Sequence, residues 1–109
     1  MSAYVVATIR RVQNRKALEA YWAHVAPTFE GTGANPLAVD TPFKQIEGEG
    51  PVQAMVVIEF PDMETAERWY GGPGYQTVKK YREGAADIDL IFVEGGVVRA
   101  QELRMPHIS

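Results

Sequence analysis

Residues 52–60 read VQAMVVIEF, the strongest β-strand pattern in this chain of 109 residues. A turn at Gly48–Pro51 precedes this strand, and Pro61 ends it. Side chains alternate between the two faces of a strand, so both faces of this one carry apolar groups. One face takes Val52, Ala54, Val56, Ile58 and Phe60, and the other takes Met55 and Val57.

Two more segments show the same two-sided apolar pattern, Ala3–Arg10 and Asp87–Glu94. In the first, Val5, Ala7 and Ile9 alternate with Tyr4, Val6 and Thr8; in the second, Ile88, Leu90 and Phe92 alternate with Ile91 and Val93. A fourth, weaker strand is expected from Pro36 to Ile46. Its Pro42 has no N–H to donate to a neighbouring strand, which predicts a position at the edge of the sheet.

A helix is expected after the first strand, starting at about Arg15 with Asn14 as its N-cap. Its apolar residues recur at helical spacing on one stripe, made of Leu18, Trp22, Val25 and Phe29. Pro27 falls inside that stripe, so a kink or a tightened last turn is expected there. The helix should end at Gly31 or Gly33.

Helical segments also follow strand 52–60. Asp62 is the expected N-cap, and Glu64 lies in the first turn, where a negative charge is favourable. The sequence GGPG at residues 71–74 interrupts this helix, and a further helix is expected from Tyr75 to about Ala86.

The order of these elements is β-α-β-β-α-β, which predicts a ferredoxin-like α+β fold with a four-stranded antiparallel sheet. Both helical segments are expected on one face of the sheet, because βαβ crossovers share one hand. We expect a single domain over residues 1–96. Residues 97–109 mix apolar and charged side chains, and we expect this tail to pack on the domain or on a partner.

The face of the sheet that the helices leave open should be polar, yet the strands place apolar side chains on it. Leaving them in water would forgo about 1.5–3 kcal/mol for each large side chain that could be buried. The chain has no spare helix to cover this face, so we expect a homodimer in which two sheets pack against each other. The alternative is that the tail folds back over the face.

Composition excludes several classes of function. The net charge of −3 gives no basic surface for nucleic acid or for an anionic membrane, and no segment is long and apolar enough for a membrane span. The opening residues MSAYVVATIRR do not resemble a signal peptide, so a cytoplasmic location is expected. There is no cysteine, and His24 and His107 are too far apart to predict a metal site. No cofactor-binding motif is present, so we expect neither metal nor cofactor.

Arg82 is the first candidate for a functional residue. On an α-helix it shares a stripe with Tyr75, Val78 and Ala86, so its guanidinium should point inward among apolar neighbours. A buried charge of this kind must be paired. The partner is either an internal carboxylate, from Asp87, Glu59 or Glu47, or the carboxylate of a substrate that Arg82 clamps.

Aromatic side chains gather on the predicted helices, namely Tyr21, Trp22, Trp69, Tyr70 and Tyr75. Core packing is the ordinary role of such groups. The functional alternative is a pocket between helices and sheet in which a tyrosine hydroxyl, such as that of Tyr70, acts as a donor or an acid. The residues expected to bind a ligand there are Trp22, Trp69, Tyr75 and Arg82.

His24 is the best candidate for a general base if the pocket opens toward it. It lies about 120° from the apolar stripe of its helix, so the ordinary expectation is an exposed histidine. The candidate catalytic residues are therefore His24, Tyr70 and Arg82.

A longer pattern of residues resembles a known family. It comprises Glu59-Phe60-Pro61-Asp62, Ala66, Trp69-Tyr70, Pro73, Tyr75-Gln76, Arg82, Ala85-Ala86-Asp87 and Val93-Glu94-Gly95, with Ala3-Tyr4-Val5 and Glu47-Gly48 before them. Over about residues 2–95 the chain resembles domain of unknown function 1330. The resemblance implies the dimeric α/β-barrel superfamily, in which two ferredoxin-like sheets face each other across a dimer axis.

The chain departs from the family pattern in three places. Its second strand region, GTGANPLAVDTPFK over residues 31–44, is longer and carries two prolines. Gly72 and Gly74 replace the usual serine and glutamate around Pro73, and the tail beyond Gly96 is extra. These differences affect loop geometry and whatever lines the second strand.

Two hypotheses of function follow. In the first, the homodimer encloses an apolar cavity and binds a small apolar or acidic metabolite, on which it acts as a cofactor-independent oxygenase or isomerase, an activity suggested only by analogy with the wider superfamily. In the alternative, the protein is a non-catalytic binding or interaction protein. A cavity where His24, a tyrosine hydroxyl and Arg82 converge would favour the enzyme, and a filled interior would favour the alternative.

Overall fold

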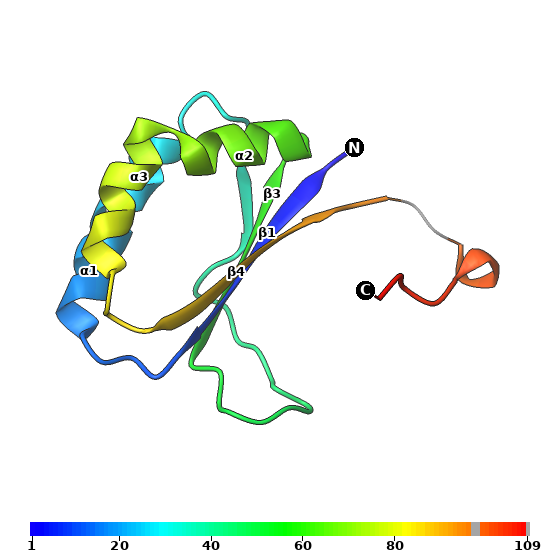
Figure 1. The fold of residues 1–109 in the computed structure, drawn as a ribbon, viewed down its shortest axis with the longest axis horizontal. Helices are drawn as coiled ribbons and strands as arrows, with labels where there is room; N and C mark the ends of the chain where they lie inside the picture. Colours follow the sequence, from blue (N-terminus) through cyan, green and yellow to red (C-terminus); the bar gives the residue numbers. More distant parts are fainter. Residues whose placement is uncertain (97–98, 109) are drawn as a thin grey trace.

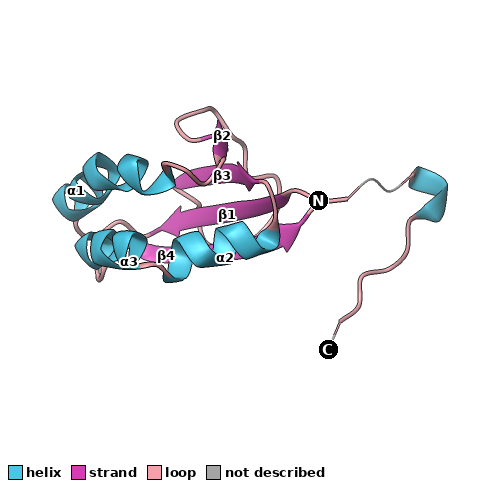
Figure 2. Ribbon diagram, turned by 90° about the horizontal axis from the view of Figure 1, so that it is seen from above, coloured by secondary structure: helices cyan, strands magenta, loops and turns pink. Residues whose placement is uncertain are grey.

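The fold is described from a computed structural model that covers residues 1–96 and 99–108. The elements follow in the order β1 (Ala3–Arg10), α1 (Arg15–Val25), η1 (Ala26–Phe29), β2 (Asn35–Ala38), β3 (Ala54–Phe60), α2 (Met63–Gly71), α3 (Pro73–Lys79), η2 (Lys80–Arg82), β4 (Asp87–Glu94) and η3 (Ala100–Glu102), where η marks a short 3₁₀ helix. The strands form one antiparallel sheet in the order β2-β3-β1-β4. Figure 1 shows α1, α2 and α3 on one side of that sheet, and Figure 2 shows the same arrangement from above. The predicted ferredoxin-like α+β fold is confirmed.

Both predicted helix caps are present. The Asn14 side chain accepts a hydrogen bond from the Ala17 N–H at 3.0 Å, and the Asp62 carboxylate accepts one from the Thr65 N–H at 2.7 Å. Hydrogen bonding with the side chain and the backbone of Thr65 holds the pKa of Asp62 below its ordinary value. Pro27 lies in η1, which is the tightened last turn that its position predicts.

The second strand is much shorter than the predicted span from Pro36 to Ile46. It has four residues, and its pairing with β3 shifts register between Pro36 and Ala38. Pro36 supplies no N–H to the ladder, so the pairing is irregular from its start. The strand does lie at the edge of the sheet, as Pro42 predicted, although Pro42 itself falls in the loop that follows.

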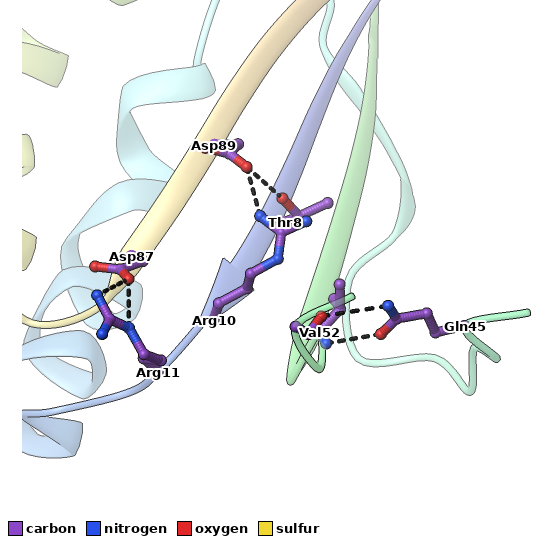
Figure 3. Close-up of polar contacts among 8 residues, drawn as sticks. Thr8, Arg10, Arg11, Gln45, Val52, Asp87 and Asp89 are labelled. Atoms are coloured by element: carbon purple, nitrogen blue, oxygen red, sulfur yellow. Dashed lines mark hydrogen bonds and ion pairs between the residues drawn. The ribbon is translucent and has the colours of Figure 1, made fainter. Parts of the chain in front are cut away.

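The loop over residues 39–53 is held together by the amide of Gln45. Its Nε2 donates to the carbonyls of Gly48 and Gly50, both at 3.2 Å. Its Oε1 accepts from the Val52 N–H at 2.9 Å (Figure 3). Both glycines have a φ in the left-handed region, +113° and +79°, which a glycine adopts without strain. These contacts return the chain to the start of β3 at Ala54, two residues later than predicted.

The predicted helix from Tyr75 to Ala86 is also shorter in the structure. α3 begins at Pro73, a residue that suits the first turn of a helix, and it ends at Lys79. The 3₁₀ turn η2 then carries the chain to Arg82, and Gly84 reverses it with a φ of +74°. Arg82 therefore does not lie on the α-helical stripe from which its inward direction was inferred.

The core lies between the helices and the sheet. Its most deeply buried large side chains are Val5, Phe60 and Tyr75, each with 2% exposure or less. A smaller cluster of Ile9, Leu18 and Ala85 closes the end of the sheet near α1.

The other face of the sheet carries apolar side chains that none of the described helices covers. In the antiparallel register, Val6 of β1 stands between Val57 of β3 and Ile91 of β4. Ile91 is 57% exposed and Val93 is 49% exposed. We call the set of Tyr4, Val6, Val57, Ile91 and Val93 the open-face patch.

One end of the sheet is charged instead. Arg10 pairs with Asp89 and Arg11 pairs with Asp87, and the Thr8 hydroxyl also donates to Asp89 at 3.5 Å (Figure 3). All of these groups are at least partly exposed, so the pairs contribute little to stability. They mark where the open-face patch ends.

The tail leaves its apolar side chains in solvent. Leu103, Met105 and Ile108 are all more than two-thirds exposed, and Figure 1 shows the tail leading away from the end of β4. Within the described residues, the tail therefore does not cover the open-face patch of its own chain. The expected packing of the tail stays a prediction, and Val97, Val98 and Ser109 lie outside the described residues.

Candidate functional site

A cavity of about 40 Å³ lies between α1, the α3–η2 segment and the sheet. Its walls are mainly apolar side chains from α1 and from the core faces of β1, β3 and β4. Its hydroxyl and charged groups come from Tyr21, Tyr75 and Arg82. A space of this size holds a few water molecules, because one water needs about 10–15 Å³ measured in this way.

Tyr21, Tyr75 and Arg82 form one hydrogen-bonded group, which we call the Arg82 cluster. The two tyrosine oxygens are 2.9 Å apart, and Nε and Nη2 of Arg82 donate to the Tyr75 oxygen at 3.3 and 3.2 Å. The Arg82 guanidinium also lies over the Tyr21 ring, 5.6 Å from its centroid. The Tyr75 oxygen already accepts two hydrogen bonds, so its own O–H donates to Tyr21.

This arrangement leaves hydrogen-bond donors without acceptors. Tyr21 accepts from Tyr75, so the proton of its own hydroxyl has no partner among the described residues. Nη1 of Arg82 takes no part in the two hydrogen bonds with Tyr75 and lies beside the Tyr21 ring. Two donors, one of them charged, therefore remain available at the edge of an apolar cavity, which suits an oxyanion.

The internal salt bridge expected for Arg82 is not formed. Asp87 pairs with Arg11, Glu59 stands on the open face beside Tyr4, and Glu47 is exposed in the 39–53 loop. Within residues 1–96 and 99–108, Arg82 makes no ion pair. The physical reason is that η2 turns the guanidinium toward the tyrosines, whereas Asp87 begins β4 with its side chain on the face away from the helices.

Burial sets the protonation state of the cluster. It raises the pKa of Tyr21 far above its ordinary value, and the hydrogen bond with Tyr75 raises it further. The positive charge of Arg82 lowers this pKa, but by less. Burial lowers the pKa of Arg82, but its hydrogen bond with Tyr75 and the charges of both tyrosines outweigh this, so the net shift is upward. At neutral pH, Tyr21 is therefore a neutral donor and Arg82 is a cation.

Replacing Tyr21 by phenylalanine is expected to make stability less sensitive to alkaline pH. The pKa of Tyr21 is higher in the folded state than in the unfolded state, where it is about 10. The buried neutral hydroxyl therefore stabilises the fold fully below about pH 10, and this contribution to the free energy of unfolding is lost as pH rises toward the folded pKa. Urea denaturation at several values between roughly pH 9 and 11 measures this. Wild type should lose stability more steeply than Tyr21→Phe, and equal slopes would contradict the burial of this hydroxyl.

Trp69 and Tyr70 lie beside the cluster but have different surroundings. The Trp69 indole is buried, donates to the Thr28 hydroxyl at 2.9 Å and packs against Tyr75. It lines the cavity. Tyr70 packs against Phe92 and Tyr75 and does not line the cavity. The structure therefore does not place the Tyr70 hydroxyl where an acid would act on a molecule in the cavity.

His24 stands apart from the cavity. It is exposed, its Nδ1 donates to the Ala20 carbonyl at 2.7 Å, and its ring stacks on Tyr81 with 4.6 Å between centroids. A donating Nδ1 leaves Nε2 as the possible base, but the ring does not line the cavity. The structure thus brings a tyrosine hydroxyl and Arg82 together and leaves His24 outside.

Trp22 lines the cavity and also a second hollow. This outer groove has a volume of about 740 Å³ and lies between α1, the end of β1 and the start of β3 and its preceding loop. It is lined by Ile9, Val12, Arg15, Leu18, Glu19, Trp22, Val39, Asp40, Gln53, Ala54 and Val56.

Sequence reasoning named Tyr21 among the aromatic residues that could line a pocket but did not include it in the expected ligand-binding set, and it did not find the groove. The signal for Tyr21 was present, because Leu18, Tyr21 and Val25 follow the i, i+3, i+7 spacing of one helix face. No pattern in the sequence predicts the groove, because it forms only where the irregular loop 39–53 places Val39 and Asp40.

Two kinds of site are absent from the described residues. Across residues 1–96 and 99–108, no three histidine, cysteine, aspartate or glutamate side chains are grouped so that they could hold a metal ion. No helix in the same part of the chain has the length and hydropathy required to cross a bilayer.

The sequence matches the family described as Domain of unknown function (DUF1330) over residues 2–96. No curated protein matches it significantly.

Solved structures share the fold. A protein of unknown function from Rhodopseudomonas palustris is 19% identical and has a TM-score of 0.69, covering 89% of this chain and 84% of its own. A dimeric ferredoxin-like protein of unknown function from Jannaschia sp. is 13% identical and has a TM-score of 0.59, covering 87% of this chain and 100% of its own. SnoaB, a cofactor-independent oxygenase from Streptomyces nogalater, is 13% identical and has a TM-score of 0.60, covering 91% of this chain and 97% of its own. Identities this low show a common fold and nothing more.

Proposed function

The chain belongs to the DUF1330 family, and we propose that it is a homodimer that binds a small, mostly apolar molecule through an oxyanion held by the Arg82 cluster. The observation that carries this proposal is the guanidinium of Arg82, which lines an apolar cavity and has tyrosine hydroxyls, but no carboxylate of the described residues, beside it. A partly buried cation of this kind gains most from an anionic ligand. The Tyr21 hydroxyl adds a neutral donor next to it.

The open-face patch supports the homodimer. Val6, Val57 and Ile91 form a continuous apolar row across three strands, and Ile91 is more than half exposed in the single chain. A second copy would remove this row from water on both chains. The Jannaschia protein, which shares the fold, is described as dimeric.

Catalysis on the bound molecule is the second candidate function, as cofactor-independent oxygenation or isomerisation. The Arg82 cluster would stabilise the negative charge that forms on a substrate oxygen when a neighbouring carbon loses a proton. SnoaB, which carries out cofactor-independent oxygenation, has a similar fold. No histidine or carboxylate is among the residues that line the cavity, so the geometry supports binding more directly than proton removal.

The proposal is tested by comparing small aromatic acids with their neutral amides. Phenylacetate is expected to raise the melting temperature, whereas phenylacetamide, which has nearly the same shape, should have little effect. An acid at ten times its Kd stabilises by about 1.4 kcal/mol, which corresponds to roughly 5–10 °C for a domain of this size. Equal shifts with acid and amide would contradict an oxyanion site.

A further inference from the structure

The inner cavity and the outer groove share one wall. Both are lined by Ile9, Leu18, Trp22 and Val56. Ile9, Leu18 and Val56 are buried, with exposures between 4% and 8%, whereas Trp22 is 38% exposed. The wall between the two hollows therefore has a single member that faces solvent.

Trp22 is also held by no hydrogen bond from its side chain within the described residues. Its indole N–H makes no hydrogen bond within residues 1–96 and 99–108, whereas the Trp69 indole is held by Thr28. Its aromatic contact within the same residues is the edge of the Tyr21 ring, with 5.6 Å between centroids. Rotation of this side chain would break no hydrogen bond within the described residues.

The volumes show that a ligand of ordinary size needs both hollows. Sites for small molecules typically measure about 300–1,000 Å³, far more than the inner cavity of 40 Å³. The outer groove, at about 740 Å³, falls within that range. A molecule whose oxyanion reaches Arg82 must therefore extend past Trp22 into the groove.

The side chains of the groove define the rest of the ligand. Val12, Val39 and Ala54 offer apolar contacts, and Arg15 is already paired with Glu19 at 3.3 Å. Asp40 adds a negative charge to the groove, which disfavours a second anionic group there.

We infer that Trp22 is the gate between the groove and the cavity, and that the ligand is an elongated monocarboxylate with an apolar body. The carboxylate lies at the Arg82 cluster and the body lies in the groove, with the Trp22 ring beside it. This inference rests on the proposed function and adds the ligand class and the entry route.

The test uses phenylacetate, 4-phenylbutyrate and 6-phenylhexanoate as probes, titrated by calorimetry. In the wild type, affinity should rise about fourfold for each added methylene that the groove buries, which is the equivalent of about 0.8 kcal/mol. Val39→Glu places a charge in the groove and should abolish this gain. Leu37→Glu is the matched control, because Leu37 is exposed and lines neither hollow.

Association rates test the gate itself. Trp22→Ala should bind 6-phenylhexanoate faster than the wild type in stopped-flow measurements, with Trp22→Phe in between, and equal rates in all three would overturn the gate. Affinity independent of chain length in the wild type would overturn the extended site, although phenylacetate binding would still support the Arg82 cluster. If none of the three acids binds, both this inference and the proposed function are wrong.

Discussion

Replacing Ile91 by aspartate is expected to convert the protein from a dimer into a monomer. Ile91 is 57% exposed in the single chain, so the fold itself should tolerate the change. In the proposed dimer the same position lies in the apolar row with Val6 and Val57, where a carboxylate would be buried without a partner. Such a charge costs several kcal/mol, and the two copies of the variant chain would carry it twice.

Sedimentation equilibrium at micromolar concentration measures this effect. The wild type should have twice the chain mass of 12.1 kDa, and Ile91→Asp should have the mass of a single chain. Tyr81→Asp is the matched control, because Tyr81 is also an exposed hydrophobic residue but stacks on His24 on the helical side. A wild type that sediments as a single chain would remove the basis for the dimer.

Replacing Arg82 by methionine is expected to abolish oxyanion binding at little cost in stability. If Arg82 formed a buried salt bridge, its removal would leave an unpaired carboxylate and cost about 3–5 kcal/mol. Its partner is the Tyr75 hydroxyl, which keeps its hydrogen bond with Tyr21 when Arg82 is removed. The expected cost is therefore about 1 kcal/mol, typical of a hydrogen bond.

Urea denaturation distinguishes these two values. Lys80→Met is the matched control, since it removes the same charge from the same 3₁₀ turn at an exposed position. A loss of about 3–5 kcal/mol for Arg82→Met would contradict this expectation. It would show that in solution Arg82 is paired with a carboxylate of the protein.

The sequence was sufficient to predict the strands that build the sheet. β1 and β4 have the bounds that were read from Ala3–Arg10 and Asp87–Glu94, because alternating apolar and β-branched residues define both strands along their whole length. The second strand was harder, since strand-forming residues such as Val39, Phe43 and Ile46 alternate in residues 36–46 with prolines and charged residues. Its actual end depends on the register shift at Pro36, which comes from pairing with β3 and not from local preference.

The Arg82 cluster could be predicted only in part. Helix periodicity brought Arg82 and Tyr75 to one side of the chain, but it assumed α-helical geometry beyond Lys79, where the structure changes to a 3₁₀ turn. Arg82 nevertheless points inward, contacts Tyr75 and lines the cavity. The contact between Tyr21 and Tyr75 joins residues 54 positions apart, which no local pattern reports.

The central claim is that Arg82 receives an anionic ligand, and calorimetric titration of 4-phenylbutyrate into wild type, Arg82→Met and Lys80→Met tests it most directly. The account predicts binding to the wild type and to Lys80→Met with similar affinity, and no measurable binding to a folded Arg82→Met protein. If Arg82→Met bound the acid as tightly as the wild type, the ligand would lie elsewhere and the claim would be wrong.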